Sequence, residues 1–485
     1  MASDWLSIEM DWTTVLLLIL LWYLLLRKWE RDGKLDDWKA SRVLGGILMV
    51  RTGSGKKVLE KISKPRKFWR AYGELSLWTC WFAMFIVAIM LVFVFVAAII
   101  FPRPDPPSAS ELVAIPGLNP MIPLGWGALA FVVCLVIHEF GHGIQARAHG
   151  MRIRNFGLLL LGPFPLGAFA EPEHSELLES PRRDRQRMFA AGPATNLFAA
   201  LLLMILMGSI AGQFVAADPG VHSRAIVVDS GAEQAGLEPW DVILSIDGEE
   251  VATTDDFSET MSELSANQTV VLQVKRYNDS TIENLNVTLT DKYQYYLDLG
   301  VDSEALDNLG IEPGDAFLGV NSLSDGTAGV DRLAGPYHSD FEGGVIDYAV
   351  NIPVHTMILL VTPFDLQGVA IHPAQEEMLG TGDGWLAQTL GLDGMLFLVN
   401  LIFWLIWVNI LLGFTNLIPM VPFDGGHLFR DMVHGIMSGL RKLGKKTRLW
   451  KIHPLWIEHV SRKTSSFSSL ILLLMLVFLI GSPYL

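Results

Sequence analysis

The chain has 485 residues, of which 51% are hydrophobic, and its formal net charge is −15. It is too long for one compact domain, and its acidic balance gives no reason to expect a nucleic-acid partner. Its two cysteines, Cys80 and Cys134, offer no cysteine-rich metal site.

Long apolar runs predict a polytopic α-helical membrane protein. A hydrocarbon core of roughly 30 Å needs about 20 residues of helix to cross it. The first run has tryptophans at its borders but neither a basic segment before it nor a cleavage site after it, so we interpret it as a retained helix rather than a signal peptide. About six transmembrane helices are expected, at residues 13–26, 75–102, 124–145, 188–217, 395–414 and 464–485.

Charge is distributed unevenly along the chain. Residues 27–73 hold 14 basic and 5 acidic residues, residues 430–463 hold 9 and 2, and residues 218–342 hold 5 and 25. Short basic loops stay in the cytoplasm, whereas a long domain is translocated largely regardless of its charge. This predicts an outside N-terminus and an acidic extracytoplasmic domain between the fourth and fifth spans. A further apolar stretch, 345–366, contains Asp347 and Pro353 and is expected to be a surface or re-entrant segment.

The third predicted span ends in His138-Glu139-Phe140-Gly141-His142, an H-E-x-x-H motif. Two histidines four residues apart on a helix share one face, so both imidazoles can reach one metal ion. Glu139 lies beside them, placed to take a proton from a metal-bound water. Ionisable groups at the end of a spanning helix are costly unless partnered, which favours a metal site over a plain helix end.

A second motif follows the fifth predicted span on the same side: Asn416-Leu-Ile-Pro419-Met-Val-Pro422-Phe-Asp424-Gly-Gly. Its prolines break the helix, and such breaks at membrane depth imply burial in protein or a water-lined cavity. Catalytic zinc usually takes three protein ligands and leaves one position open. Asp424 is therefore a candidate third ligand, and a helix-exit turn with a capping aspartate is the alternative.

Together the two motifs resemble the site-2 protease family of intramembrane peptidases (peptidase family M50). The resemblance implies that His138, His142 and Asp424 bind Zn²⁺ and that Glu139 is the general base. Two shorter matches support it: Gly192-Pro193-Ala-Thr-Asn196 resembles the family's G-P-x-x-N signature, and residues 167–172 resemble a segment of archaeal-type members. For Asn196 and Asn416 the sequence allows two roles, a helix–helix contact or a donor to the substrate backbone or oxyanion, and we favour the second role for both.

Two other segments suggest peptide binding. Residues 156–170 mix glycine and proline with apolar residues, which favours a membrane-dipping hairpin whose strand edge could hold an extended substrate. Residues 225–248 resemble a PDZ domain through the pattern A-G-L-x-x-x-D-x-I-x-x-I-D-G, with Trp240 before Asp241. That domain would either capture peptides or exclude bulky ectodomains.

The expected organisation has six parts. They are an N-terminal membrane region (1–123), a first catalytic part (124–217), the PDZ-like domain (218–291), an acidic extension (292–393), a second catalytic part (394–427) and a basic segment with the final helix (428–485). The expected activity is zinc-dependent cleavage of a single-pass membrane protein, shortened beforehand by another protease, near the cytoplasmic face of the cell membrane in regulated intramembrane proteolysis. A silent scaffold would not need Glu139, and a transporter would show internal repeats, which are not evident.

Overall fold

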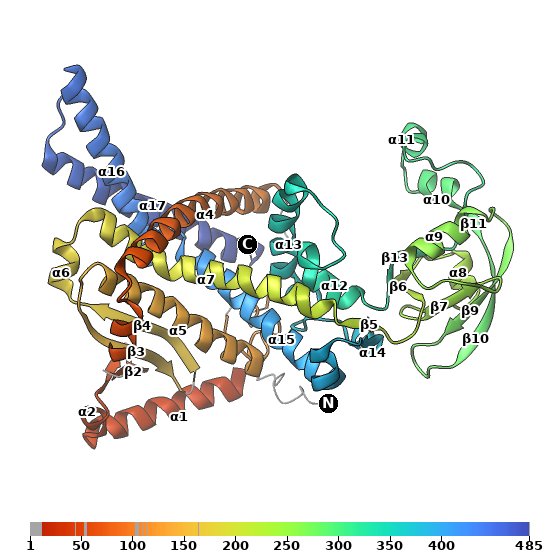
Figure 1. Ribbon diagram of the computed structural model, residues 1–485, viewed down its shortest axis with the longest axis horizontal. Helices are drawn as coiled ribbons and strands as arrows, with labels where there is room; N and C mark the ends of the chain where they lie inside the picture. The colour runs from red at the N-terminus through yellow and green to blue at the C-terminus, as the bar shows by residue number, and fades with distance from the viewer. Residues whose placement is uncertain are drawn as a thin grey trace. The chain divides into compact units, whose positions relative to one another are not determined.

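The computed structural model describes residues 12–43, 45–52, 56–101, 106–108, 110–112, 114–162 and 164–484. These residues form two compact units, coloured by position along the chain in Figure 1. The first, here called the helical unit, comprises the described residues up to Met204, Thr356–Val369 and the residues from Asn400 onward. The second, here called the β unit, comprises Ile205–His355 and Ala370–Val399.

Long helices, most of them apolar, dominate the part of the chain that holds the two motifs. They are α1 (Trp12–Arg31), α4 (Arg66–Ile100), α5 (Leu124–Ala148), α7 (Arg182–Ala211), α13 (Val345–Asp365), α15 (Trp385–Asn416), α16 (Asp424–Thr447) and α17 (Pro454–Gly481). Short helices complete the helical unit: α2 (Lys34–Asp37), α3 (Lys56–Ile62) and α6 (His174–Glu179). Among the described residues, six helices are long and apolar enough to cross a membrane, namely α4, α5, α7, α13, α15 and α17 with its short extension. A polytopic helical membrane protein, as the sequence predicted, follows from this composition.

This set of six differs from the predicted set at two places. Residues 345–366 were expected to be a surface or re-entrant segment, but they form one continuous 21-residue helix despite the prolines. Helix α1, predicted as a span, is 20 residues long with exposed leucines, and it is not among the six.

A four-stranded antiparallel sheet lies beside α5, in the strand order β1-β2-β3-β4. Its strands are β1 (Ala40–Val43), β2 (Ile47–Thr52), β3 (Ile153–Leu161) and β4 (Phe164–Pro172). The last two form a hairpin in the segment where the sequence predicted one, with Phe156 opposite Ala170. The first two come from the basic loop before α4, and the sequence analysis assigned no strands there. Because β4 is the end strand, one of its edges faces α5 rather than another strand.

The β unit is built on an antiparallel sheet in the order β10-β9-β7-β6-β13, with β8 paired to β7. Its main strands are β6 (Val221–Ile226), β7 (Val242–Ile246), β8 (Glu249–Glu250), β9 (Thr269–Lys275), β10 (Ile282–Thr288) and β13 (Val320–Asp325). The smaller elements are β5 (Phe214–Ala216), α8 (Gly231–Gln234), α9 (Thr254–Ser262), β11 (Thr290–Asp291), α10 (Lys292–Asp298), α11 (Ser303–Asn308), β12 (Ala316–Phe317), α12 (Ala328–Ala334), α14 (Pro373–Glu377) and β14 (Leu379–Thr381). The sheet continues past residue 291, where the sequence placed the domain boundary, because β13 pairs with β6.

Candidate metal centre

Helix α5 carries the first motif close to its C-terminal end. Pro123, just before the helix, has an extended backbone (ψ 143°), and Gly150, just after it, has φ 89°. Helix α5 is continuous between these two residues. His138 and His142 are one turn apart, and their rings meet edge to face with centroids 4.7 Å apart. The ligand atoms of His138, Glu139 and His142 lie within 4.8 Å of one another, as expected for a metal-binding group.

Asp424 joins the two histidines. Its Oδ2 lies 3.3 Å from His138 Nε2 and 3.2 Å from His142 Nε2, and the two imidazole nitrogens are 3.1 Å apart. Two nitrogens and one carboxylate oxygen therefore converge on one point from two helices distant in sequence.

Asp424 reaches this point because α15 ends at Asn416 and α16 begins at Asp424 itself. The chain turns between Asn416 and Asp424, and the next two glycines pack against this turn. A Cβ on Gly425 would lie 2.5 Å from the Leu417 carbonyl carbon, and one on Gly426 would lie 2.5 Å from that of Met420. The turn is thus too tight for side chains at these two positions, which explains the D-G-G sequence.

Each histidine is oriented through its other ring nitrogen. His142 Nδ1 lies 2.8 Å from the Met188 carbonyl oxygen, and His138 Nδ1 lies 2.6 Å from Asn196 Oδ1. Both partners are acceptors, so each Nδ1–H donates and each Nε2 presents its lone pair to the Asp424 side. Such outer contacts fix the tautomer and ring orientation of metal-ligating histidines.

Asn196 has no exposed surface, and its hydrogen-bonding groups are taken up inside the protein. Besides accepting a hydrogen bond from His138 through Oδ1, it donates through Nδ2 to the Cys134 carbonyl at 3.1 Å and to Asn409 Oδ1 at 2.8 Å. Asn409, on α15, donates in turn to the Leu405 carbonyl at 2.8 Å. This arrangement favours orientation of His138 over donation to a substrate. The sequence analysis did not single out Asn409, although a polar side chain within the apolar run 395–414 was a signal for it.

The three ligand atoms fit a zinc ion. Tetrahedral zinc with Zn–N distances of about 2.0–2.1 Å separates its ligand atoms by about 3.3 Å, close to all three observed separations. Gly192 of α7 faces the same point: a Cβ there would lie 2.3 Å from His142 Nε2 and 2.7 Å from His138 Nε2. Any larger residue would fill the space that the ion needs. The sequence analysis quoted Gly192 as part of a signature and assigned it no such role.

A cavity of about 330 Å³ opens onto this centre. Polar groups on its wall are His138, Glu139, His142, Asn416 and Asp424, and the rest of the wall is apolar, including residues of α5, α6, α7, β3 and β4. Glu139 Oε2 accepts a hydrogen bond of 2.7 Å from the Ala170 amide of β4, so the carboxylate sits between the metal ligands and the strand edge. The Asn416 side chain donates to the Leu412 carbonyl at 3.0 Å and borders the cavity.

Comparison with known proteins identifies the family. The model of peptidase family M50 matches residues 126–453, which include both motifs. The chain belongs to peptidase family M50.

Relatives in bacteria and archaea agree with this assignment. An uncharacterized protein of Methanocaldococcus jannaschii is 26% identical over 273 residues, covering 56% of this chain and 70% of its own. Proteins that carry provisional zinc metalloprotease names are similar as well. One from Rhizobium meliloti is 27% identical over 343 residues (60% of this chain, 81% of its own), and one from Nostoc is 25% identical over 337 residues (63% and 84%).

As a member of the M50 family, the protein is a zinc metalloprotease and a multi-pass integral membrane protein that acts on membrane-embedded protein substrates. The predicted enzyme class, zinc cofactor and membrane location are thereby confirmed. The structure brings His138, Glu139, His142 and Asp424 to one cavity, with Asn416 on its wall and Asn196 behind His138.

Proposed function

We propose that His138, His142 and Asp424 hold the zinc ion and that Glu139 is the general base of peptide hydrolysis. The observation that carries this assignment is the triangle of ligand atoms 3.1–3.3 Å apart beside a fourth, non-ligating carboxylate. When bound, zinc supplies a Lewis acid that makes water a strong nucleophile near neutral pH.

Glu139 then moves the proton. Its carboxylate is held by the Ala170 amide, so it can accept a proton from the attacking water and pass it to the leaving amine without a large movement. Asn416, with one of its two amide hydrogens engaged by the Leu412 carbonyl, has a second hydrogen for the oxyanion or the substrate backbone. Asn196 is better suited to positioning His138.

The edge of β4 is the proposed holding site for substrate. A peptide bond inside a helix is shielded, so the protease must bind its substrate extended, and addition to a sheet edge achieves this. Ala170 lies on that edge and touches Glu139, so a strand added there would pass along the cavity wall. The substrate class we propose is a single-pass membrane protein, already shortened outside the membrane, whose cytoplasmic part is released in regulated intramembrane proteolysis at the cell membrane.

The proposed topology has the site near the cytoplasmic face and the β unit outside. In this scheme α1, α4, α5, α7, α15 and α17 cross, and α13 does not. A Cβ on Gly368, just after α13, would lie 2.6 Å from the Pro120 carbonyl oxygen, so α13 ends on the side where α5 begins. Helix α7 ends on that side too, because its Met188 lies at the His142 end of α5. Helix α15 starts there in order to reach Asn416. Because the end of α7 and the start of α15 lie on the same side, the chain between them must cross the membrane an even number of times. A single crossing by α13 is therefore excluded from this scheme.

For the β unit we propose a PDZ-like fold that limits access to the membrane site. Its A-G-L to I-D-G segment begins directly after α8 and covers β7 and the turn that follows, within an antiparallel sheet. Limiting the size of ectodomains fits an intramembrane protease at least as well as capture of a particular peptide.

The decisive experiment combines cleavage with zinc analysis. Purified protein should cut members of a panel of single-pass helices, and a chelator should stop it. Glu139→Gln keeps the shape of the side chain but cannot take a proton, so activity should fall by about 10²–10⁴-fold while the zinc content is unchanged. Chelator-sensitive turnover at the normal rate in Glu139→Gln would overturn the mechanism.

A further inference from the structure

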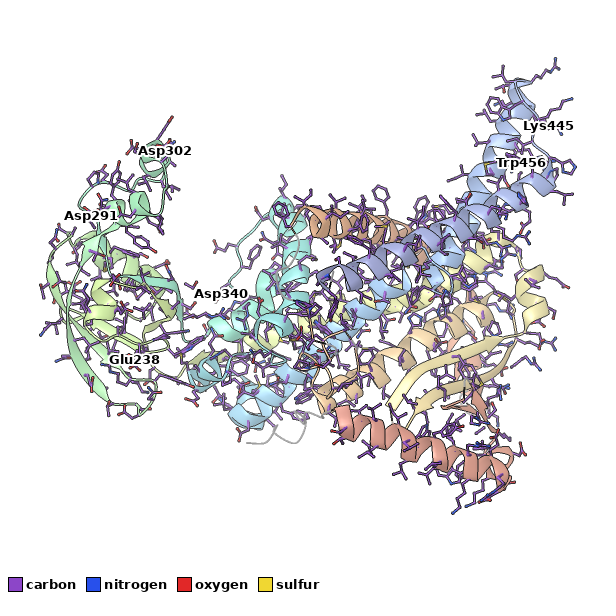
Figure 2. The ribbon with its side chains drawn as sticks, turned by 180° about the vertical axis from the view of Figure 1, so that it is seen from behind. Glu238, Asp291, Asp302, Asp340, Lys445 and Trp456 are labelled. Carbon is purple, nitrogen blue, oxygen red and sulfur yellow. The ribbon has the colours of Figure 1, made fainter. Side chains whose placement is uncertain are left out.

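Beyond the metal centre, the end of α16 and the start of α17 form an exposed basic arm, defined here as residues 435–457. Three apolar residues of α16 occur at helical spacing and are exposed: Ile436 (56%), Leu440 (40%) and Leu443 (48%). The chain that returns to α17 adds Leu449 (74%), Trp450 (38%), Leu455 (74%) and Trp456 (60%). Figure 2 shows Lys445 near the tip of α16 and Trp456 near the start of α17, both away from the bulk of the helical unit.

Charge on the arm has a single sign. It contains Arg441, Lys442, Lys445, Lys446, Arg448 and Lys451, and no acidic residue lies between Asp431 and Glu458. At 100° per residue, Arg441, Lys442 and Lys445 fall on the side of α16 opposite the three exposed apolar residues, and Lys446 falls at the border between the two faces. The arm is therefore amphipathic, with an apolar face and a basic face.

Crossing the hydrocarbon core does not account for these apolar residues. Helix α17 has 28 residues, and about 20 suffice to cross. Its first turns carry Glu458, paired with Arg430 at 2.7 Å, and then Arg462 and Lys463. These charges mark where α17 leaves the hydrocarbon, and the arm precedes them in the sequence. Its exposed leucines and tryptophans must therefore be buried against something other than the hydrocarbon core that α17 crosses.

We propose that the basic arm docks on the surface of an anionic bilayer. A helix with leucine and tryptophan on one face and lysine and arginine on the other suits the headgroup region, where the apolar face is buried and the basic face meets anionic lipid. Helix α17 tethers the arm to the same membrane, so the lipid surface is always within reach. Because α16 runs unbroken from Asp424 to Thr447, docking would also fix the tilt of the helix that supplies a proposed zinc ligand.

A label at the arm of the full-length protein tests this proposal. Cys80 and Cys134 are buried, so a maleimide fluorophore should react with the new thiol of Leu449→Cys. The labelled protein is placed in nanodiscs of phosphatidylcholine alone or with phosphatidylglycerol, and quenching by a headgroup-attached nitroxide lipid is measured. We expect strong quenching with phosphatidylglycerol, weak quenching without it, and loss of the difference at high salt.

Four charge removals on the arm sharpen the test. One basic residue near an anionic surface contributes about a fivefold gain in binding, so K442Q/K445Q/K446Q/K451Q should lower the ratio of docked to undocked arm by about 600-fold, nearly three orders of magnitude. The matched control K57Q/K61Q/K64Q/K67Q removes the same charge from another exposed basic segment and should leave the quenching unchanged.

Three results would overturn the proposal. Equal quenching in both kinds of nanodisc would show that anionic lipid is not the partner. Protection of position 449 from maleimide labelling by inorganic phosphate in detergent would show a free-anion site. Protection of the same position from labelling in native membranes, but not in nanodiscs with phosphatidylglycerol, would indicate that a protein covers the arm.

Discussion

The two units bury different chemistry. Around the metal centre of the helical unit, Asn196, Asn409 and His138 are 0–4% exposed and are linked by hydrogen bonds of 2.6 and 2.8 Å. The β unit instead encloses an apolar cluster drawn mainly from its strands, including Ile243, Ile246, Leu272, Val274 and Val287, each at most 1% exposed. Polar atoms fix the geometry around the metal centre, and apolar contacts hold the strands of the β unit together.

This difference predicts how each unit responds when a buried side chain is removed. A buried polar chain loses a full hydrogen-bonding partner when one member is removed, and the remaining groups stay desolvated. An apolar core loses stability roughly in proportion to the volume removed, without changing the position of any polar atom. Damage in the helical unit should therefore appear in zinc binding, and damage in the β unit should appear in local stability.

The largest expected effect is loss of the third zinc ligand. Asp424→Ala leaves two histidines, too few for tight tetrahedral binding, so purified protein should fall from about one zinc per chain to far less. Asp431→Ala is the matched control, because Asp431 lies two turns further along α16 and pairs with Arg185 rather than with the histidines. Metal analysis after gel filtration measures both. Full occupancy in Asp424→Ala would remove it from the ligand set.

A smaller effect is expected two hydrogen bonds away from the ion. Asn409→Leu removes the acceptor for Asn196 and so loosens His138, which should weaken zinc binding about 10–100-fold. Competition with a chromogenic chelator measures this, and the visible spectrum of the cobalt-substituted protein should change with it. Thr362→Val, which removes a buried hydrogen bond to Ile358 on α13, serves as the control. An unchanged affinity with an unchanged cobalt spectrum would mean that Asn409 serves packing alone.

These residues also show where sequence reasoning succeeded and where it stopped. The H-E-x-x-H spacing acts within one helix, so His138 and His142 could be placed on one face from local geometry. Asn409 and Gly192 matter only because α15 and α7 pack against α5, and no local pattern reports that packing. The same holds for the sheets: β2 is recognisable through its pairing with β3, about a hundred residues later.

The β unit also buries polar side chains, and one of them, His222, gives a pH-dependent prediction. His222 is 1% exposed and stacks on Trp240 with ring centroids 5.7 Å apart. Burial, opposed by Asp325 and reinforced by Arg224, lowers the pKa of His222 to about 4. The unfolded histidine takes up a proton below about pH 6.5 and the folded one does not until about pH 4, so stability should fall as the pH drops through that window.

The stability of the β unit should change by at most about 1.4 kcal/mol per pH unit for one proton. Hydrogen exchange of the β7 and β9 amides in the full-length protein measures this stability, and His222→Phe should make it nearly independent of pH between pH 6.5 and 4. The same steep loss of protection in His222→Phe would place the titrating group elsewhere.

The smallest expected effect on the metal centre comes from the largest change to the chain. Val221 and Asp325 are paired residues of neighbouring antiparallel strands, so their Cα atoms lie only about 5 Å apart. Residues 221–325 can therefore be excised and the ends joined by a short glycine linker between Gly220 and Gly326 with little strain on the rest of the chain.

The proposed zinc ligands all lie in the helical unit, and none of the atoms that orient them is in the excised segment. We expect unchanged zinc content and continued cleavage of substrates with short ectodomains, together with new cleavage of substrates whose ectodomains the full-length protein rejects. Loss of zinc on excision would show that the two units do not hold their geometry separately. Loss of all cleavage with zinc retained would favour substrate capture by the β unit over size exclusion.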